Sequence, residues 1–153
     1  MLTIRSSIVN NGNGAATRLV YTPFNGNVTT LTGANTYTGG TQLNGNISHT
    51  GTLALNVTGA NGGSTVAIPA GDLEINNATV RLDQASQIHN SVVPVIHGAG
   101  TLALNNNSQT LAGLSFINDG SSTAAAVTTG TGILTLTGGI TATSSNVGSV
   151  SVI

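Results

Sequence analysis

One six-residue phrase occurs twice in this chain, and a related phrase follows it. Gly-Thr-Leu-Ala-Leu-Asn occupies residues 51–56 and again 100–105, and Gly-Ile-Leu-Thr-Leu-Thr occupies 132–137. Recurrence of one strand-sized unit, separated by loops of unequal length, is typical of a chain that stacks similar layers. The repeat therefore favours a solenoid over a single irregular core.

The composition predicts an all-β domain. Only 5% of the 153 residues are charged, whereas ordinary soluble domains have about 25%. Thr, Ser, Asn and 21 Gly stand where a helix surface would need long polar side chains. Thr, Val and Ile favour extended backbone, and a hydrophobic content of 39% is enough for one core. We expect one domain over residues 1–153, either a complete subunit or a segment of a longer rod.

Charge and residue content also exclude several classes of function. A net charge of -1 with three Lys plus Arg residues cannot neutralise a nucleic-acid backbone. No apolar run reaches about 18 residues and no signal-peptide series opens the chain, so we expect no membrane-embedded segment. The chain has no cysteine, no Trp and 3% aromatic residues, so disulfides, thiolate metal sites and stacking platforms are not expected. We predict no cofactor and no metal site.

Apolar residues alternate with small polar ones along the chain, and each alternating pair predicts a short strand with one buried face. The pairs are Leu2/Ile4, Leu19/Tyr21, Leu53/Leu55 with Val57, Val66/Ile68, Leu73/Ile75, Val80/Leu82, Val93/Val95, Leu102/Leu104, Leu114/Phe116, Leu134/Leu136 and Val150/Val152. Asn-Gly and Gly-Gly dipeptides between them indicate turns.

This pattern admits either an antiparallel sandwich or a solenoid of parallel rungs, and the repeated phrase favours the solenoid. With about 20 to 25 residues per turn, we expect roughly six or seven rungs. Inward Leu and Ile would form continuous columns, and outward or turn Asn and Thr would form hydrogen-bonded ladders between layers.

The stretch Leu31-Thr-Gly-Ala-Asn-Thr-Tyr-Thr-Gly-Gly-Thr41, followed by Gln42-Leu43-Asn44, resembles the autotransporter-associated β-strand repeat, also called the passenger-associated transport repeat. The stretch from Gly100 to Leu114 is similar to the layer that commonly follows in those proteins. The resemblance implies a single-stranded, right-handed parallel β-helix in the exported part of a bacterial autotransporter or related cell-surface protein. The chain departs from the family in lacking a signal sequence and a terminal barrel, and in the insertion from Gly45 to His49. We therefore expect an excerpt or a standalone descendant of that family.

Neither end of the sequence has the features of a solenoid cap. The chain opens with Met1-Leu-Thr-Ile4 and closes with Ser149-Val-Ser-Val-Ile153, without a charge to guard the last strand. Two explanations fit: the chain is cut from a longer β-helix, or copies stack end to end into a filament. For the second, we expect the terminal rungs to self-associate through these residues: Leu2, Ile4, Val150, Val152 and Ile153.

Asp72, Glu74, Arg81 and Asp83 form the densest group of charges in the sequence. The alternation places all four outward, where an ion pair between Arg81 and an acid explains them. The alternative is the pair of carboxylates with which glycoside hydrolases cleave polysaccharides.

The remaining motifs favour structural roles. His49, His89 and His97 lack the spacing of a shared metal site and are predicted on the surface or in loops. Gly98-Ala-Gly100 imitates a nucleotide-binding turn, but strand rather than helix follows it. Several Asn residues head Asn-x-Ser/Thr triplets, and we expect ladders or turns there rather than glycosylation. The aromatic residues are predicted in the core or in stacking contacts rather than in a sugar platform: Tyr21, Phe24, Tyr37 and Phe116.

These features together predict a non-catalytic structural or adhesive β-helix, extracellular or on the bacterial outer surface, that self-associates as a homopolymer by end stacking. One alternative is an excerpt of an autotransporter passenger used in adhesion. Another is a polysaccharide-binding or polysaccharide-cleaving β-helix, for which host or bacterial surface glycans are the candidate partners.

Overall fold

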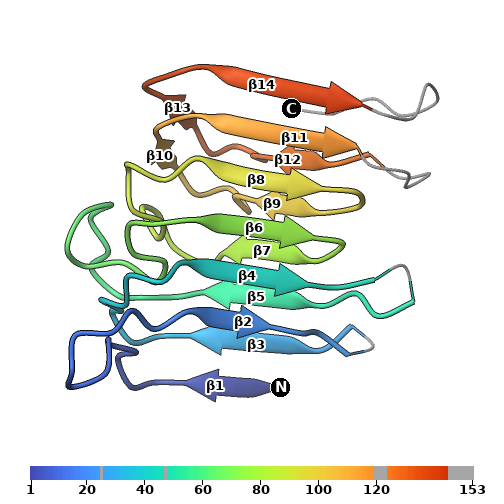
Figure 1. The fold of residues 1–153 in the computed structure, drawn as a ribbon. Coiled ribbons are helices and arrows are strands. Elements are labelled where there is room, and N and C mark those ends of the chain that lie inside the picture. The colour runs from blue at the N-terminus through green and yellow to red at the C-terminus, as the bar shows by residue number, and fades with distance from the viewer. Residues whose placement is uncertain (25, 47, 119–123, 145–153) are drawn as a thin grey trace.

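The chain winds as a parallel β-solenoid of about five turns, shown in Figure 1. The computed structural model describes residues 1–24, 26–46, 48–118 and 124–144. Sheet A contains β1 (Leu2–Ile4), β3 (Val28–Leu31), β5 (Thr52–Leu55), β7 (Thr79–Leu82), β9 (Thr101–Ala103) and β12 (Ala126–Thr128). Sheet B contains β2 (Leu19–Tyr21), β4 (Thr41–Asn44), β6 (Leu73–Asn76), β8 (Pro94–His97), β11 (Leu114–Asn118) and β14 (Ile140–Ser144). A third side carries the pair β10 (Gln109–Leu111) and β13 (Leu134–Leu136).

Among the described residues, every pairing between strands is parallel and joins one turn of the chain to the next. One turn takes 27 residues from Leu53 to its register partner Val80, and 22 residues from Val80 to Leu102. The described residues contain no helix. The all-β class and the stacked parallel architecture predicted from the sequence are therefore confirmed, and the rung number is roughly as expected.

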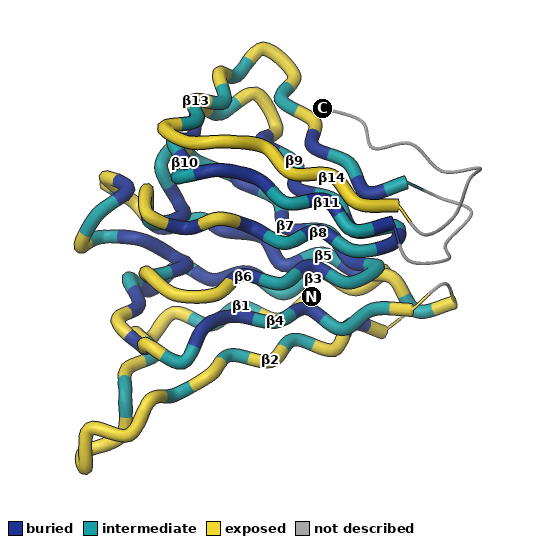
Figure 2. The backbone as a smooth tube through the Cα atoms, turned by 45° about the horizontal axis from the view of Figure 1, so that its top comes forward, coloured by how far each residue is buried: buried dark blue, intermediate teal, exposed yellow. Residues whose placement is uncertain are grey.

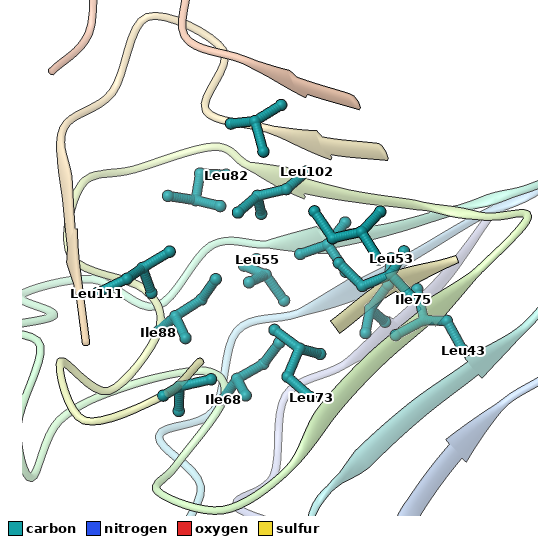
Figure 3. Close-up of a cluster of buried hydrophobic side chains, with 14 of the residues drawn as sticks. Leu43, Leu53, Leu55, Ile68, Leu73, Ile75, Leu82, Ile88, Leu102 and Leu111 are labelled. Carbon is teal, nitrogen blue, oxygen red and sulfur yellow. The ribbon is translucent and has the colours of Figure 1, made fainter. Parts of the chain in front are cut away.

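The hydrophobic core fills the interior of the coil, enclosed by sheets A and B and by the third side, and Figure 3 shows part of it. Much of it consists of columns of apolar register partners. One column in sheet A contains, in register order, Leu53, Val80, Leu102 and Val127. One column in sheet B contains Leu43, Ile75, Ile96 and Phe116. All eight side chains are at most 2% exposed, so each contributes roughly 1.5 to 3 kcal/mol of hydrophobic stabilisation. The predicted inward columns are confirmed.

The repeated phrase marks one face of the solenoid. Its two copies form β5 and β9, which lie in sheet A on either side of β7. The related phrase at 132–137 forms β13 instead, on the third side against β10. The first two copies therefore occupy equivalent positions two layers apart, and the third copy reuses the strand unit on another face.

The structure corrects the prediction for Val93 and Val95. In β8 the buried residues are Pro94 and Ile96, which register with Leu73 and Ile75, whereas Val93 is 44% exposed. The run from Val92 to Ile96 is apolar throughout, so alternation within it cannot define the buried face. The register with β6 decides it, and Pro94 is tolerated because it is the first residue of the strand.

Other deviations arise where an inward position is polar or small. Thr41 and Gln109 are buried in β4 and β10, so neither strand shows an apolar pair in the sequence. The alternation also does not predict three strands whose residues are largely Thr and Ala: β3, β12 and β14. The predicted pair Val66/Ile68 forms no named strand and contributes a single bridge, from Ile68 to Ile88. The predicted strand at Val150/Val152 lies outside the described residues.

Buried amide side chains connect the layers where strand pairing is sparse. Gln87 accepts from Val57 N at 2.7 Å through Oε1 and donates to Val57 O at 3.0 Å through Nε2. Gln109 repeats this one layer later with Ile88, at 3.0 and 2.8 Å. Asn35 accepts from Ile8 N at 2.8 Å and donates to Ala67 O at 2.7 Å. Each amide thus satisfies buried backbone groups as a strand neighbour would.

Replacing Gln87 with Ala should destabilise the protein by about 2 to 4 kcal/mol, because Val57 N and O lose their buried partner. Urea unfolding followed by circular dichroism measures the change. Gln84→Ala is the matched control, since the Gln84 amide is only partly buried and bonds the side chain of Asn56. Equal losses in the two variants would contradict the structural role assigned to Gln87.

Tyr37 is the largest buried side chain with an ionisable group. It is 1% exposed, and its hydroxyl shares a 2.6 Å hydrogen bond with Thr41 Oγ1. Burial raises the pKa of Tyr37 to about 12 from its ordinary value of 10.0, while the bond to Thr41 partly opposes the shift. Since the folded pKa is the higher one, the associated stability is complete below pH 10 and is lost as the pH rises toward 12.

The free energy of unfolding should therefore fall by about 2 to 3 kcal/mol between pH 10 and pH 12 through Tyr37. Urea titrations at several alkaline pH values measure the fall. The Tyr37→Phe variant should lack this component, and subtraction of its profile removes the contribution of every other group. Parallel profiles for the two proteins would refute the assignment.

Candidate functional site

The first layer of the solenoid exposes the end of the hydrophobic core. A hollow of about 330 Å³ opens there, between β1 and β2. Its lining is mostly apolar and consists of Leu2, Ile4, Leu19, Val20, Tyr21, Thr22, Thr29, Leu31 and Leu53. Leu2 is 58% exposed, whereas Leu31 and Leu53, one and two layers further in, are each 1% exposed. Figure 2 shows this change from exposed to buried residues between the first layers and the middle of the rod.

Strand edges at both ends lack a partner on one side among the described residues. In sheet A, β1 pairs with β3 and β12 pairs with β9; in sheet B, β2 pairs with β4 and β14 pairs with β11. The last described layer also exposes apolar side chains, with Ile133 at 66% and Ile140 at 46%. Each end therefore presents backbone donors and acceptors together with apolar surface, which is the composition of a strand-addition surface.

The predicted self-association residues fall into two groups. Leu2 and Ile4 lie in β1, the first strand, and line the hollow. Val150, Val152 and Ile153 lie outside the described residues. Leu19 and Tyr21 also belong to this end, although the sequence does not place them there. Their alternation in β2 is the signal that turns both side chains inward.

The predicted charge group is divided between opposite faces of the solenoid. Arg81 and Asp83 lie on the outer side of sheet A, with Nε to Oδ1 at 2.7 Å and Nη2 to Oδ2 at 3.0 Å. The bond to Asp83 raises the pKa of Arg81. Glu74 lies on the outer side of sheet B, where Oε2 is 3.4 Å from Arg18. The predicted ion pair between Arg81 and an acid is confirmed, and the two sets of carboxylates do not share a groove.

Polar side chains form a grid on the outer face of sheet B. Gln42 and Glu74 are register partners in β4 and β6, and so are Asn44 and Asn76. Gln42 Nε2 donates to Glu74 Oε2 at 2.8 Å, and Asn76 Nδ2 donates to Asn44 Oδ1 at 3.3 Å. His97 continues the second row as the register partner of Asn76. These bonds confirm the predicted ladders between layers.

The histidines lie on turns or outer faces, as predicted. His49 stacks on Phe24 with ring centroids 5.3 Å apart and an interplanar angle of 29°. Nδ1 of His89 is 2.8 Å from Ser91 Oγ. Within the described residues no three His, Asp or Glu side chains gather as a metal site would require.

The predicted placement of the aromatic residues, in the core or in a stacking contact, is confirmed, and several asparagines lie in turns between layers as expected. Tyr37 and Phe116 are buried, whereas Phe24 is 61% exposed and takes part in the stacking contact just described. Asn77 Oδ1 accepts from Ala99 N at 2.9 Å, and Asn106 Oδ1 accepts from Thr131 N at 3.0 Å. These asparagines therefore connect turns of adjacent layers.

No known protein family, curated protein or solved structure gives a significant match to this chain. In the part of the chain that the structure describes, no helix has the length and hydropathy to cross a membrane.

The division of charges predicts which pairs are energetically coupled. A double-mutant cycle of Arg81→Ala and Asp83→Ala should give a coupling of about 0.2 to 1 kcal/mol, because both side chains are partly exposed. The matched cycle of Glu74→Ala and Asp83→Ala should be additive, since the two carboxylates lie on opposite faces. Chemical denaturation of the single and double variants measures both. Coupling of Glu74 to Asp83 above the experimental error would contradict the separation.

Proposed function

We propose that this protein is a non-catalytic structural and adhesive rod of the bacterial exterior, which self-associates end to end through its first layer. The observation that carries the proposal is the apolar hollow at that layer, bordered by the strand edges β1 and β2. Burial of Leu2 and its neighbours beneath a further layer would remove apolar surface from water, at about 25 cal/mol per Å². A second copy of the chain is the partner that supplies such a layer.

The edge strands at the two described ends have the arrangement that pairing between stacked copies requires. β12 and β14 are the edge strands of sheets A and B at one end, and β1 and β2 are the edge strands at the other. A copy stacked in the same orientation would pair β12 with β1 and β14 with β2, and so would continue both sheets in parallel. Residues 124–144 carry no charged side chain, so no charge repulsion opposes the contact. A head-to-tail contact of this kind does not close and generates a filament.

An exterior location is supported by the resemblance of residues 31–44 to the autotransporter-associated repeat. In this stretch the apolar and aromatic residues Leu31, Tyr37 and Leu43 are buried, together with the polar residues Asn35 and Thr41, so its apolar and aromatic positions serve the core of the solenoid. The scarcity of charge fits a persistent exterior fibre, since three Arg and no Lys leave few sites for trypsin-like proteases. An excerpt of a longer autotransporter passenger is the alternative, in which layers of the same polypeptide cover the hollow.

Leu2→Lys tests the self-association. Leu2 is 58% exposed, so the substitution should alter the stability of the single subunit by less than about 1 kcal/mol. A lysine at the edge of the apolar column should abolish stacking, because its charge would be buried without a partner. Sedimentation velocity and negative-stain microscopy should show particles that lengthen with concentration for the unaltered chain and single subunits for Leu2→Lys.

Val93→Lys is the matched control, because Val93 is 44% exposed and lies on the side of the rod before β8. This variant should assemble like the unaltered chain. Persistent single subunits of the unaltered chain at high concentration would reject end stacking and leave the excerpt alternative.

A further inference from the structure

The polar grid on the outer face of sheet B holds its side chains in fixed positions. Gln42 and Arg18 both donate to the same oxygen of Glu74, Oε2, at 2.8 and 3.4 Å. Asn76 donates through Nδ2 to Oδ1 of Asn44. The bonds within the grid already restrict the rotation of these side chains, so binding of a ligand would cost little further side-chain entropy.

The same bonds leave a second polar atom of each side chain available. Within the described part of the chain, no hydrogen bond engages Oε1 of Gln42, Oε1 of Glu74, Oδ1 of Asn76 or Nδ2 of Asn44. All four residues are partly exposed. The grid therefore offers three acceptors and one donor to a ligand. They form two rows, Gln42 with Glu74 and Asn44 with Asn76, and each row crosses from one layer to the next over about 4.8 Å.

An exposed aromatic pair lies at the same edge of sheet B. Phe24 lies in the turn that follows β2, and His49 in the turn that follows β4. Asn44 and Asn76 are the last residues of β4 and β6, so the asparagine row ends at the edge where these turns begin. Phe24 is 61% exposed while it stacks on His49, which leaves much of its ring open to a ligand.

The outer face of sheet A differs. Thr52, Thr79 and Thr101 form one row across its layers. The row beside it carries Ala54, Arg81 and Ala103, and Arg81 makes two hydrogen bonds to Asp83. One amide pair lies just beyond β5 and β7, where Gln84 Nε2 donates to Asn56 Oδ1 at 2.7 Å, but the described strands of sheet A themselves carry no paired amides on this face. The two faces therefore provide an internal comparison within one molecule.

We propose that the outer face of β4 and β6, with the Phe24–His49 pair beside it, binds a neutral polysaccharide. Sugar hydroxyls both donate and accept, which matches a grid that offers both functions. The Glu74 charge is balanced by Arg18, so the grid provides little attraction for a strongly charged ligand. An aromatic ring supplies apolar contact for the C–H face of a sugar, a role for Phe24 that its sequence context did not predict and that its 61% exposure allows. The inference rests on the adhesive part of the proposed function. The grid itself lies on the side of the rod and away from the stacking end, whereas Phe24 also lines a hollow at the first layer together with Met1 and Leu2.

The test measures binding of three oligosaccharide probes by isothermal titration calorimetry: cellohexaose, chitohexaose and oligogalacturonate. We expect one of the two neutral probes to bind, with affinity unchanged between 50 and 500 mM salt, roughly the range over which screening of exposed charges becomes strong. Asn44→Ala combined with Asn76→Ala should weaken binding by about ten-fold or more, through loss of two hydrogen-bonding groups. Phe24→Ala should weaken it independently.

Thr52→Ala combined with Thr79→Ala is the matched control, since it truncates two register partners on the outer face of sheet A. This control should bind as the unaltered chain does, and circular dichroism verifies that each variant retains its fold. Sedimentation of Asn44→Ala/Asn76→Ala should match that of the unaltered chain, so failure of glycan binding is distinguishable from failure of assembly.

Three results would overturn the proposal. The first is the absence of binding to both neutral probes at millimolar concentration. The second is salt-sensitive binding of oligogalacturonate alone, which would assign the face to an anionic ligand through Arg18. The third is an equal loss of affinity in the sheet A control, which would place the ligand elsewhere on the rod.

Discussion

Register between successive turns is the constraint on which the rest of the structure depends. Each strand pairs in parallel with the strand one turn away, so residues at equivalent positions are stacked directly on one another. A slip of one residue would bring Leu53 to the outside of sheet A and expose a whole column. Continuous apolar columns on both sheets oppose such a slip, because every layer would lose its buried residues at once.

The register is maintained although the turns differ in length. The third side absorbs the difference: between β5 and β6 the chain spans residues 56–72, and between β7 and β8 only residues 83–93. Within the described residues, strand pairing on that side is confined to β10 with β13 and to one isolated bridge, Ile68 with Ile88. Three buried amides connect the layers on that side in place of strand pairing: Gln87, Gln109 and Asn35. Each offers a donor and an acceptor to the backbone of a neighbouring layer. Because these hydrogen bonds satisfy the amide groups, the three polar side chains are tolerated in the core at 0 to 2% exposure.

Much of the fold follows from the sequence, because the inward columns impose alternation on each strand. Leu73/Ile75 and Val80/Leu82 gave their strands and buried faces directly. The predicted strands and buried faces were wrong or missing where apolar and polar residues do not alternate. The apolar run at 92–96 has no polar positions to define a face, and Gln109 is buried only because it bonds a layer that is distant in sequence.

The candidate sites were less predictable for a related reason. Asp72, Glu74, Arg81 and Asp83 are close in sequence, but the chain crosses from sheet B to sheet A between Asn76 and Thr79, which divides them. The grid of Gln42, Asn44, Glu74 and Asn76 brings together segments about 32 residues apart. Such a grid depends on the exact length of one turn, and turn length is not encoded by any local pattern.

The perpendicular arrangement of the hollow and the grid has a consequence for a polymer of this protein. The hollow faces along the rod axis, whereas the grid faces sideways, so end-to-end growth leaves every grid accessible. A filament would then display the same polar surface at regular intervals along one side. A long glycan held at many such points dissociates only when all of them release together, so retention would increase steeply with filament length although no single contact is strong.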